Sequence, residues 1–409
     1  MTEHKPPIRV QATSTDQPVT TLELFFDLVF VFAITQVTAL MAHDLTAHGM
    51  IRGILIIGLL WWSWIGYSWL CNLVKADEGS LRLVMLAAMA AMFGIALAIP
   101  EAFHDLPGGL SGPVVIAVAY FIFRALHLVL FWLIADGDAV LRRTLLRFAP
   151  SMLAGTALLL AASQFHGRTQ TLLWGAALLA DYGGTFLIDA RGWRFNSARH
   201  FAERHGLIVI IALGESIVAI GVGVTDLPIS WPIVIASVLG LAASAALWWI
   251  YFDATAISGE HALVNEPEET RPKLARDAYT FLHFPMIAGV VLLALGLKKV
   301  LEYVGDTEHH ELSDPLKGIG LYSLFLGVAI YLLGHVGFKW RTAHQVGVSR
   351  LAATALVIAA IPLVAKVPAL GQLGVLVAIL IALIAYESIH YAAHREELRH
   401  GPHSSPSPE

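Results

Sequence analysis

Charge is scarce in this chain. Asp, Glu, Lys and Arg make up 14% of the 409 residues, whereas about a quarter of the residues of a soluble domain are charged. Cysteine is represented by Cys71 alone, which excludes a disulfide framework. The net charge of -5 leaves no basic excess for binding a nucleic acid. These shortages exclude an ordinary soluble enzyme, a disulfide-rich secreted domain and a nucleic-acid-binding protein.

Catalytic and cofactor signatures are also missing. The chain has no HExxH, no P-loop, no G-x-S-x-G and no GxGxxG after a strand. Glu387, His390 and His394 share one helix face with a spacing that suits a first-row metal, but the charged run that follows them makes a solvated helix end the simpler interpretation. We therefore expect no catalytic residue, no cofactor and no metal site.

Apolar residues are abundant and account for 57% of the chain. They form runs of about 20 residues bounded by charge, glycine or proline, which is the length of a membrane-spanning helix. The sequence therefore predicts an all-α polytopic membrane protein with membrane lipids around it, and it leaves a homo-oligomer open. The twelve predicted spans are 22–43, 51–73, 81–100, 113–135, 148–165, 171–188, 205–225, 231–252, 277–297, 316–338, 349–366 and 370–391.

The positions of lysine and arginine predict the orientation of these spans, because positively charged loops stay in the cytoplasm. The two tails and every second loop, beginning with the loop between spans 2 and 3, carry 19 of the 26 basic residues. The opposite loops carry 6, and Arg124 lies inside a span. We expect both termini to be cytoplasmic.

The two halves of the chain also resemble each other in register. Residues 28–36 align with 207–215, the Trp pair 61–62 with 248–249, and Arg147 with Arg350, with an offset that grows in one direction. This series predicts two parallel six-helix repeats with a polar site between them. The predicted divisions are a cytoplasmic tail (1–19), a first repeat (20–190), a second repeat (191–394) and a disordered cytoplasmic tail (395–409).

Ionisable residues inside the spans are the candidates for function, because such groups avoid lipid and face partner helices or water. Glu23 completes a capping box with Thr20, which explains it structurally, whereas Asp27 lies one turn deeper. Arg124 lies at the centre of its span and needs an anion or a wet cavity. We expect it to pair with Glu215, which reaches a similar depth, in either a functional or a structural bridge.

The remaining candidates are carboxylates and imidazoles that could pass protons along the bundle. His127 follows Arg124 by one turn on the same face, and imidazole changes its charge near neutral pH. The complete expected network consists of Glu23, Asp27, Arg124, His127, Asp181, Glu203, Arg204, His205, Glu215 and His283.

Four segments carry distinctive motifs. They read TLELFFDLVFVFAI (21–34), FRALH (123–127), HFAERHG through ALGES (200–216) and LHFP (282–285). Together they resemble the bacterial low temperature requirement protein A (LtrA) family over nearly the whole chain. The resemblance implies a multi-pass protein of the bacterial inner membrane that is linked to growth at low temperature, in a family without an agreed biochemical activity.

The first span is also similar to the first helix of lysosomal and bacterial potassium channels built from six-helix repeats. Phe26-Asp27 followed by Phe30 matches part of their Phe-Ser-Asp signature, with Phe26 in the place of the Ser. The second half of this chain has Arg204-His205-Gly206 where the signature would recur. The similarity thus implies the six-helix plan and does not extend to the potassium pore.

Two hypotheses about function follow. In the first, ions, protons or a small solute pass between the repeats, Asp27 or Glu215 exchanges protons, and His127 or His205 relays them. In the alternative, the chain is a membrane-embedded enzyme or a lipid-responsive cold-stress protein, in which a cytoplasmic vestibule binds a headgroup or a cofactor. The density of intramembrane charge favours transport, and an enzyme is the less favoured class.

Overall fold

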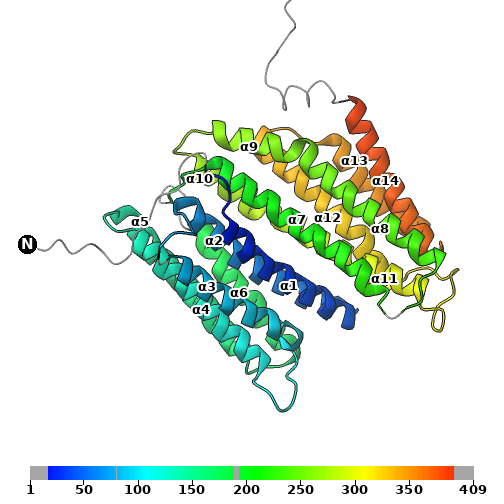
Figure 1. Ribbon diagram of the computed structural model, residues 1–409, viewed down its shortest axis with the longest axis horizontal. Coiled ribbons are helices and arrows are strands. Elements are labelled where there is room, and N and C mark those ends of the chain that lie inside the picture. Colours follow the sequence, from blue (N-terminus) through cyan, green and yellow to red (C-terminus); the bar gives the residue numbers. More distant parts are fainter. Residues whose placement is uncertain (1–16, 80, 188–192, 226, 391–409) are drawn as a thin grey trace, which may run out of the picture. The chain divides into compact units, whose positions relative to one another are not determined.

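The structure is a computed structural model that describes residues 17–79, 81–187, 193–225 and 227–390 (Figure 1). All regular secondary structure in these ranges is helical, which confirms the predicted all-α class. The predicted C-terminal tail (395–409) and His394 lie outside the described residues, as does most of the predicted N-terminal tail (1–19).

The helices follow one another along the chain as coloured from blue to red in Figure 1. The helices are α1 (Thr21–His43), α2 (Ala47–Leu73), α3 (Leu81–Ala98), α4 (Gly112–Ile134), α5 (Ala139–Ala162), α6 (Gly167–Leu187), α7 (Ala198–Gly223), α8 (Trp231–Ile250), α9 (Ala256–Asn265), α10 (Arg271–Leu274), α11 (His283–Gly305), α12 (Gly318–Ala343), α13 (Val348–Val364) and α14 (Ala369–His390). A π-helical turn (Tyr251–Thr255) joins α8 to α9, and a longer one (Ala275–Phe281) follows α10.

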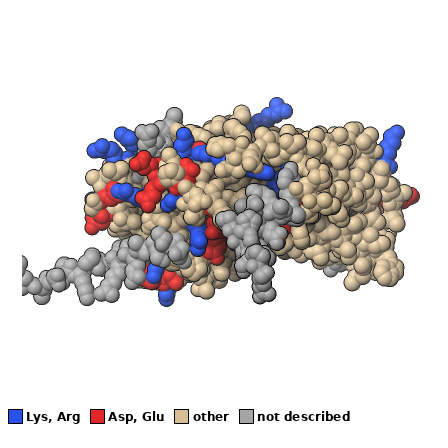
Figure 2. All heavy atoms as spheres, turned by 90° about the horizontal axis from the view of Figure 1, so that it is seen from above, with Lys and Arg blue, Asp and Glu red and all other residues tan. Residues whose placement is uncertain are grey.

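Each of the twelve predicted spans corresponds to one of these helices or to a helix extended by a π-helical turn. Ten helical segments in the described ranges are long and apolar enough to cross a membrane; α13 is shorter, and α6 is not among the ten. Large apolar side chains such as Leu179 and Leu363 are more than 70% exposed, and wide areas of the surface carry neither acidic nor basic groups (Figure 2). A multi-pass membrane protein is therefore confirmed.

Local sequence explains where several helices begin. The expected capping box is present at α1, where the Thr20 side chain accepts from the Glu23 backbone and Glu23 bonds the Thr20 backbone in return. Asp138 caps α5 by accepting from the backbone N–H groups of Val140 and Leu141. With this cap α5 begins nine residues before the predicted span 148–165, because the capping side chain satisfies backbone N–H groups that the first turn leaves without partners.

The described chain folds into two compact units. The first contains the described residues up to Arg204 together with Pro267–Arg276, and the second contains the described residues of His205–Glu266 and those from Asp277 onward. In the first unit α1 packs on α2 and α3, α3 on α4, α4 on α5, α5 on α6, and α6 returns to α2. In the second unit α11 packs on α12, α12 on α13, α13 on α14, and α14 returns to α8. These parallel contact orders support the predicted duplication, which stays a prediction.

Glycines allow the closest helix pair in the second unit. Gly289 and Gly296 on α11 and Gly327 and Gly334 on α12 recur every seven residues, on one face of each helix. A β-carbon at Gly289 would lie 2.5 Å from the Gly327 carbonyl oxygen, and one at Gly327 would lie 2.6 Å from the Leu293 nitrogen. The two backbones are therefore in direct contact, as in other small-residue interfaces between membrane helices.

We expect Gly289→Ala to destabilise the protein by about 1–3 kcal/mol, because the added methyl group must push the two backbones apart. Unfolding in mixed detergent micelles measures the difference. Gly374→Ala on α14 is the matched control, since a β-carbon there meets nothing within 4 Å and alanine is the better helix former. Equal stability of the two variants would contradict the close contact.

Candidate functional site

A cluster of four ionisable side chains lies buried in the first unit. Glu23 and Asp27 are one turn apart on α1, and His200 and Arg204 are one turn apart at the beginning of α7. Each is at most 1% exposed. The guanidinium of Arg204 donates to both oxygens of Asp27, at 2.9 and 3.1 Å. Two carboxylates on α1 therefore face two basic side chains on α7, Glu23 opposite His200 and Asp27 opposite Arg204.

Glu23 has a second role beside capping. Its Oε2 accepts from the Thr20 backbone N–H at 2.7 Å, while Oε1 lies 3.0 Å from Nε2 of His200. Since a carboxylate only accepts, His200 places the proton of its Nε2 toward Glu23. The structural explanation by capping is therefore correct but incomplete.

Two residues that the sequence argument did not select hold this cluster in place. The indole N–H of Trp64 on α2 donates to Asp27 Oδ1 at 2.9 Å, and the Arg204 guanidinium lies 5.4 Å from the centre of the Trp64 ring. Asn72, near the end of α2, bonds two backbone groups just before α7. Its side-chain N–H donates to the Ser197 carbonyl, and its side-chain oxygen accepts from the Asn196 backbone N–H. An asparagine at the end of an apolar helix was the available signal, because buried amides normally have partners.

The charges of this four-residue cluster do not balance by themselves. Two carboxylates face one guanidinium, so the net charge is −1 when the His200 imidazole is neutral and zero when it is protonated. A buried net charge is costly, and a cluster of this composition therefore has a physical reason to bind one proton.

A second buried pair lies in the same unit. Arg124 Nη2 on α4 donates to Asp181 Oδ1 on α6 at 3.2 Å, and both residues are 1% exposed. The hydroxyl of Tyr120 also bonds Asp181. The predicted partner of Arg124 is therefore wrong: the carboxylate is Asp181 and not Glu215. Equal depth along two helices does not make side chains neighbours, because proximity also depends on which helices pack together.

His127 does not join this pair. Its Nε2 donates to the Gly66 carbonyl at 2.9 Å, so Nδ1 is left as an acceptor, and this buried atom has no partner among the described residues. Its ring packs instead against Tyr67 and Phe131. The expected relay from Arg124 through His127 is thus not visible as a hydrogen-bonded chain.

The other expected network residues are dispersed. Glu203 is exposed and accepts from the Val19 backbone. Glu215 is buried in the second unit. His205 and His283 are also buried in that unit, with ring centres 5.1 Å apart. His283 accepts at Nε2 from the Tyr251 hydroxyl at 2.9 Å, because its Nδ1 faces the Ala278 carbonyl. Of the ten predicted residues, the structure thus brings together Glu23, Asp27 and Arg204 in one group, Arg124 and Asp181 in another, and His205 and His283 in a third.

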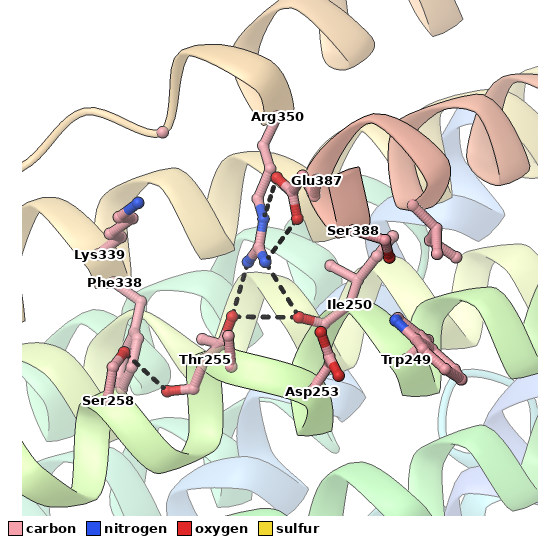
Figure 3. A pocket seen from close by; sticks show the side chains of 13 residues that line it. Trp249, Ile250, Asp253, Thr255, Ser258, Phe338, Lys339, Arg350, Glu387 and Ser388 are labelled. Carbon is pink, nitrogen blue, oxygen red and sulfur yellow. Dashed lines mark hydrogen bonds and ion pairs between the residues drawn. The ribbon is translucent and has the colours of Figure 1, made fainter. Parts of the chain in front are cut away.

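The second unit has its own ion pair, between the buried Arg350 of α13 and the half-buried Glu387 of α14 (Figure 3). Nε and Nη2 of Arg350 each lie 3.1 Å from a Glu387 oxygen. Nη1 donates to Thr255 Oγ1 at 2.7 Å and to His335 Nδ1 at 2.9 Å, and Nη2 also donates to the Ile250 carbonyl at 3.2 Å. All five N–H donors of the guanidinium are thus satisfied, which is the pattern of a structural lock.

A pocket opens beside this lock and is lined by Asp253, Ser258, Lys339 and Ser388 together with the Arg350 pair (Figure 3). Glu387, considered above for metal binding, uses its carboxylate for Arg350 and for the Ser349 hydroxyl. His390 bonds the Tyr386 carbonyl through Nδ1. Within the described ranges no three His, Cys, Asp or Glu side chains are grouped to hold a metal ion.

We expect Arg124→Gln to destabilise the protein by about 3–5 kcal/mol, because it leaves Asp181 as an uncompensated buried charge. The double variant Arg124→Gln/Asp181→Asn should recover most of this loss, since it removes both charges together. Detergent unfolding of the wild type, the two single variants and the double variant gives the coupling between the two residues. Additive losses would show that the pair does not interact.

Comparison with known proteins places the chain in a family. A relative from Rhizobium meliloti (strain 1021), the uncharacterized protein RA0937, is 28% identical over 359 residues, which cover 81% of each chain. No solved structure matches this chain. The model of the bacterial low temperature requirement A protein (LtrA) family matches residues 18–385, a range that includes α1, α7 and the ion pairs of Arg204 with Asp27 and of Arg124 with Asp181. The chain therefore belongs to the LtrA family.

Proposed function

We propose that this LtrA family member is a proton-linked channel or transporter, in which Glu23, Asp27, His200 and Arg204 form the proton-binding site. The observation that carries the proposal is the unbalanced charge of this buried cluster. The two other ion pairs, Arg124 with Asp181 and Arg350 with Glu387, each balance internally. Among these three groups of charged side chains, only the four-residue cluster becomes neutral when it gains a proton.

The chemistry of the cluster suits this role. Imidazole is the side chain whose ordinary titration falls nearest to neutral pH, and the His200 ring is already in hydrogen-bond contact with a carboxylate. Asp27 is held by two guanidinium bonds and one indole bond. We infer that Glu23 and His200 exchange the proton, while the Asp27–Arg204 pair keeps the surroundings polar.

The same proposal includes a placement in the membrane. The distribution of lysine and arginine supports cytoplasmic termini in a bacterial inner membrane. The cluster lies at the first turns of α1 and α7, which in this orientation is the cytoplasmic end of both helices. Protons would then enter from the cytoplasm, and the transported partner would be an ion or a small solute.

Flux into proteoliposomes tests the proposal. Purified protein is reconstituted with a pH-sensitive dye inside, and proton, potassium, sodium and chloride gradients are applied in turn. We expect the wild type to carry flux that changes the internal pH. Glu23→Gln and His200→Gln should reduce it to the level of empty liposomes, because each removes one member of the exchanging pair.

His43→Gln is the matched control for His200→Gln. His43 lies on α1 as well but is exposed at the opposite end of the helix, so flux should be unchanged. Folding of each variant is verified by its unfolding midpoint. Normal flux in folded His200→Gln would remove this residue from the mechanism, and a wild type without flux under every gradient would overturn transport itself.

A further inference from the structure

A group of arginines lies at the beginning of α5. Arg142 pairs with Asp136 at 2.8 Å, and Arg194, which approaches the same helix end, pairs with Asp138 at 2.7 Å. The hydrogen bond from Arg194 holds the pKa of Asp138 below its ordinary value, so this carboxylate stays charged at neutral pH. Two of the arginines near this helix end are therefore neutralised by neighbours.

Arg143 and Arg147 differ from these neighbours. They are one turn apart on α5, both are exposed, and neither has an ion-pair or hydrogen-bond partner among the described residues. Two unpartnered guanidinium groups on one helix face can bind the same anion, and their fork geometry matches a phosphate group.

An apolar groove lies further along α5, beyond Arg147. It runs between α4 and α5, whose small residues Ala117 and Ala157 leave its floor open and whose larger residues Phe121 and Leu153 stand exposed at its sides. The full lining is Ala117, Val118, Phe121, Leu153, Thr156, Ala157 and Leu160. By helical rise, the α5 part of the groove begins about 9 Å from Arg147 and ends about 20 Å from it.

The groove begins within the leaflet whose headgroups the two arginines would reach, and it extends to about the middle of the membrane. The hydrocarbon of one leaflet is about 15 Å thick, and phosphate groups lie at its outer boundary. Arginines near the end of a spanning helix extend their side chains to that boundary. The Arg142 guanidinium also lies 5.2 Å from the centre of the Trp132 ring, and tryptophan is enriched at the same depth. The arginines thus lie at the depth of the lipid headgroups, and the groove lies at the depth of the acyl chains.

We propose that this face of the first unit is a binding site for an anionic phospholipid. Arg143 and Arg147 hold the phosphate, and one acyl chain lies in the groove between α4 and α5. The charge selects an anionic lipid over a zwitterionic one, because two unpaired cations gain more from an anionic headgroup. The inference is independent of the proton-binding cluster and of transport.

The test measures retained lipid. Wild-type protein is placed in nanodiscs that contain phosphatidylcholine and phosphatidylglycerol, extracted into detergent, and analysed by native mass spectrometry. We expect it to retain phosphatidylglycerol in preference to phosphatidylcholine. Arg143→Gln/Arg147→Gln should lose that preference, whereas Arg168→Gln/Lys366→Gln, which removes two exposed basic groups from other helix ends, should keep it.

A second variant examines the groove without changing charge. Ala157→Phe fills the groove from an exposed position, so it should lower the amount of retained lipid while the unfolding midpoint in lipid-free detergent stays that of the wild type. Unchanged lipid retention in both the double arginine variant and Ala157→Phe would overturn the proposal. A wild-type dimer that these substitutions dissociate would overturn it as well, because the face would then be an interface between copies.

Discussion

The structure depends on one constraint: a charge placed among membrane-spanning helices must be neutralised by a nearby group. In the described residues each deeply buried arginine meets a carboxylate. Arg204 meets Asp27, Arg124 meets Asp181 and Arg350 meets Glu387. Each pair joins two different helices. A buried ion pair contributes little net stability, but separating its members is costly, so these pairs determine which helices are neighbours.

The three pairs differ in how fully their polar groups are used. Arg350 has five acceptors for its five donors, and its role is structural. The Arg124 pair is neutral but leaves the buried Arg124 Nε without a partner. The cluster around Arg204 contains an additional carboxylate and an imidazole, so its charges do not balance while the imidazole is neutral. This difference between a saturated ion pair and a cluster of unbalanced charge is the reason why we propose the proton site at α1 and α7.

The lipid face follows the same logic from the outside. Arg143 and Arg147 have no protein partner among the described residues, and in a membrane the available anions are headgroups. Arg124 and Arg204 in the interior of the first unit meet a carboxylate on another helix, and in our proposal the exposed Arg143 and Arg147 meet a phosphate of the bilayer instead. The close glycine contact between α11 and α12 belongs to the second unit and supplies packing without charge.

Sequence alone determined the approximate positions of the twelve long helices, the membrane class, the capping box at Thr20 and the resemblance to the LtrA family, because length, apolar content and local motifs are properties of the chain itself. It did not predict the short helices α9 and α10. It also marked Glu23, Asp27, Arg124, Asp181 and Arg204 as buried charges. Tertiary structure decided which of them meet. Position along a helix gives only depth, whereas the choice of Asp181 over Glu215, the contact of His200 with Glu23 and the lock between Arg350 and Glu387 depend on helix rotation and on which helices pack together.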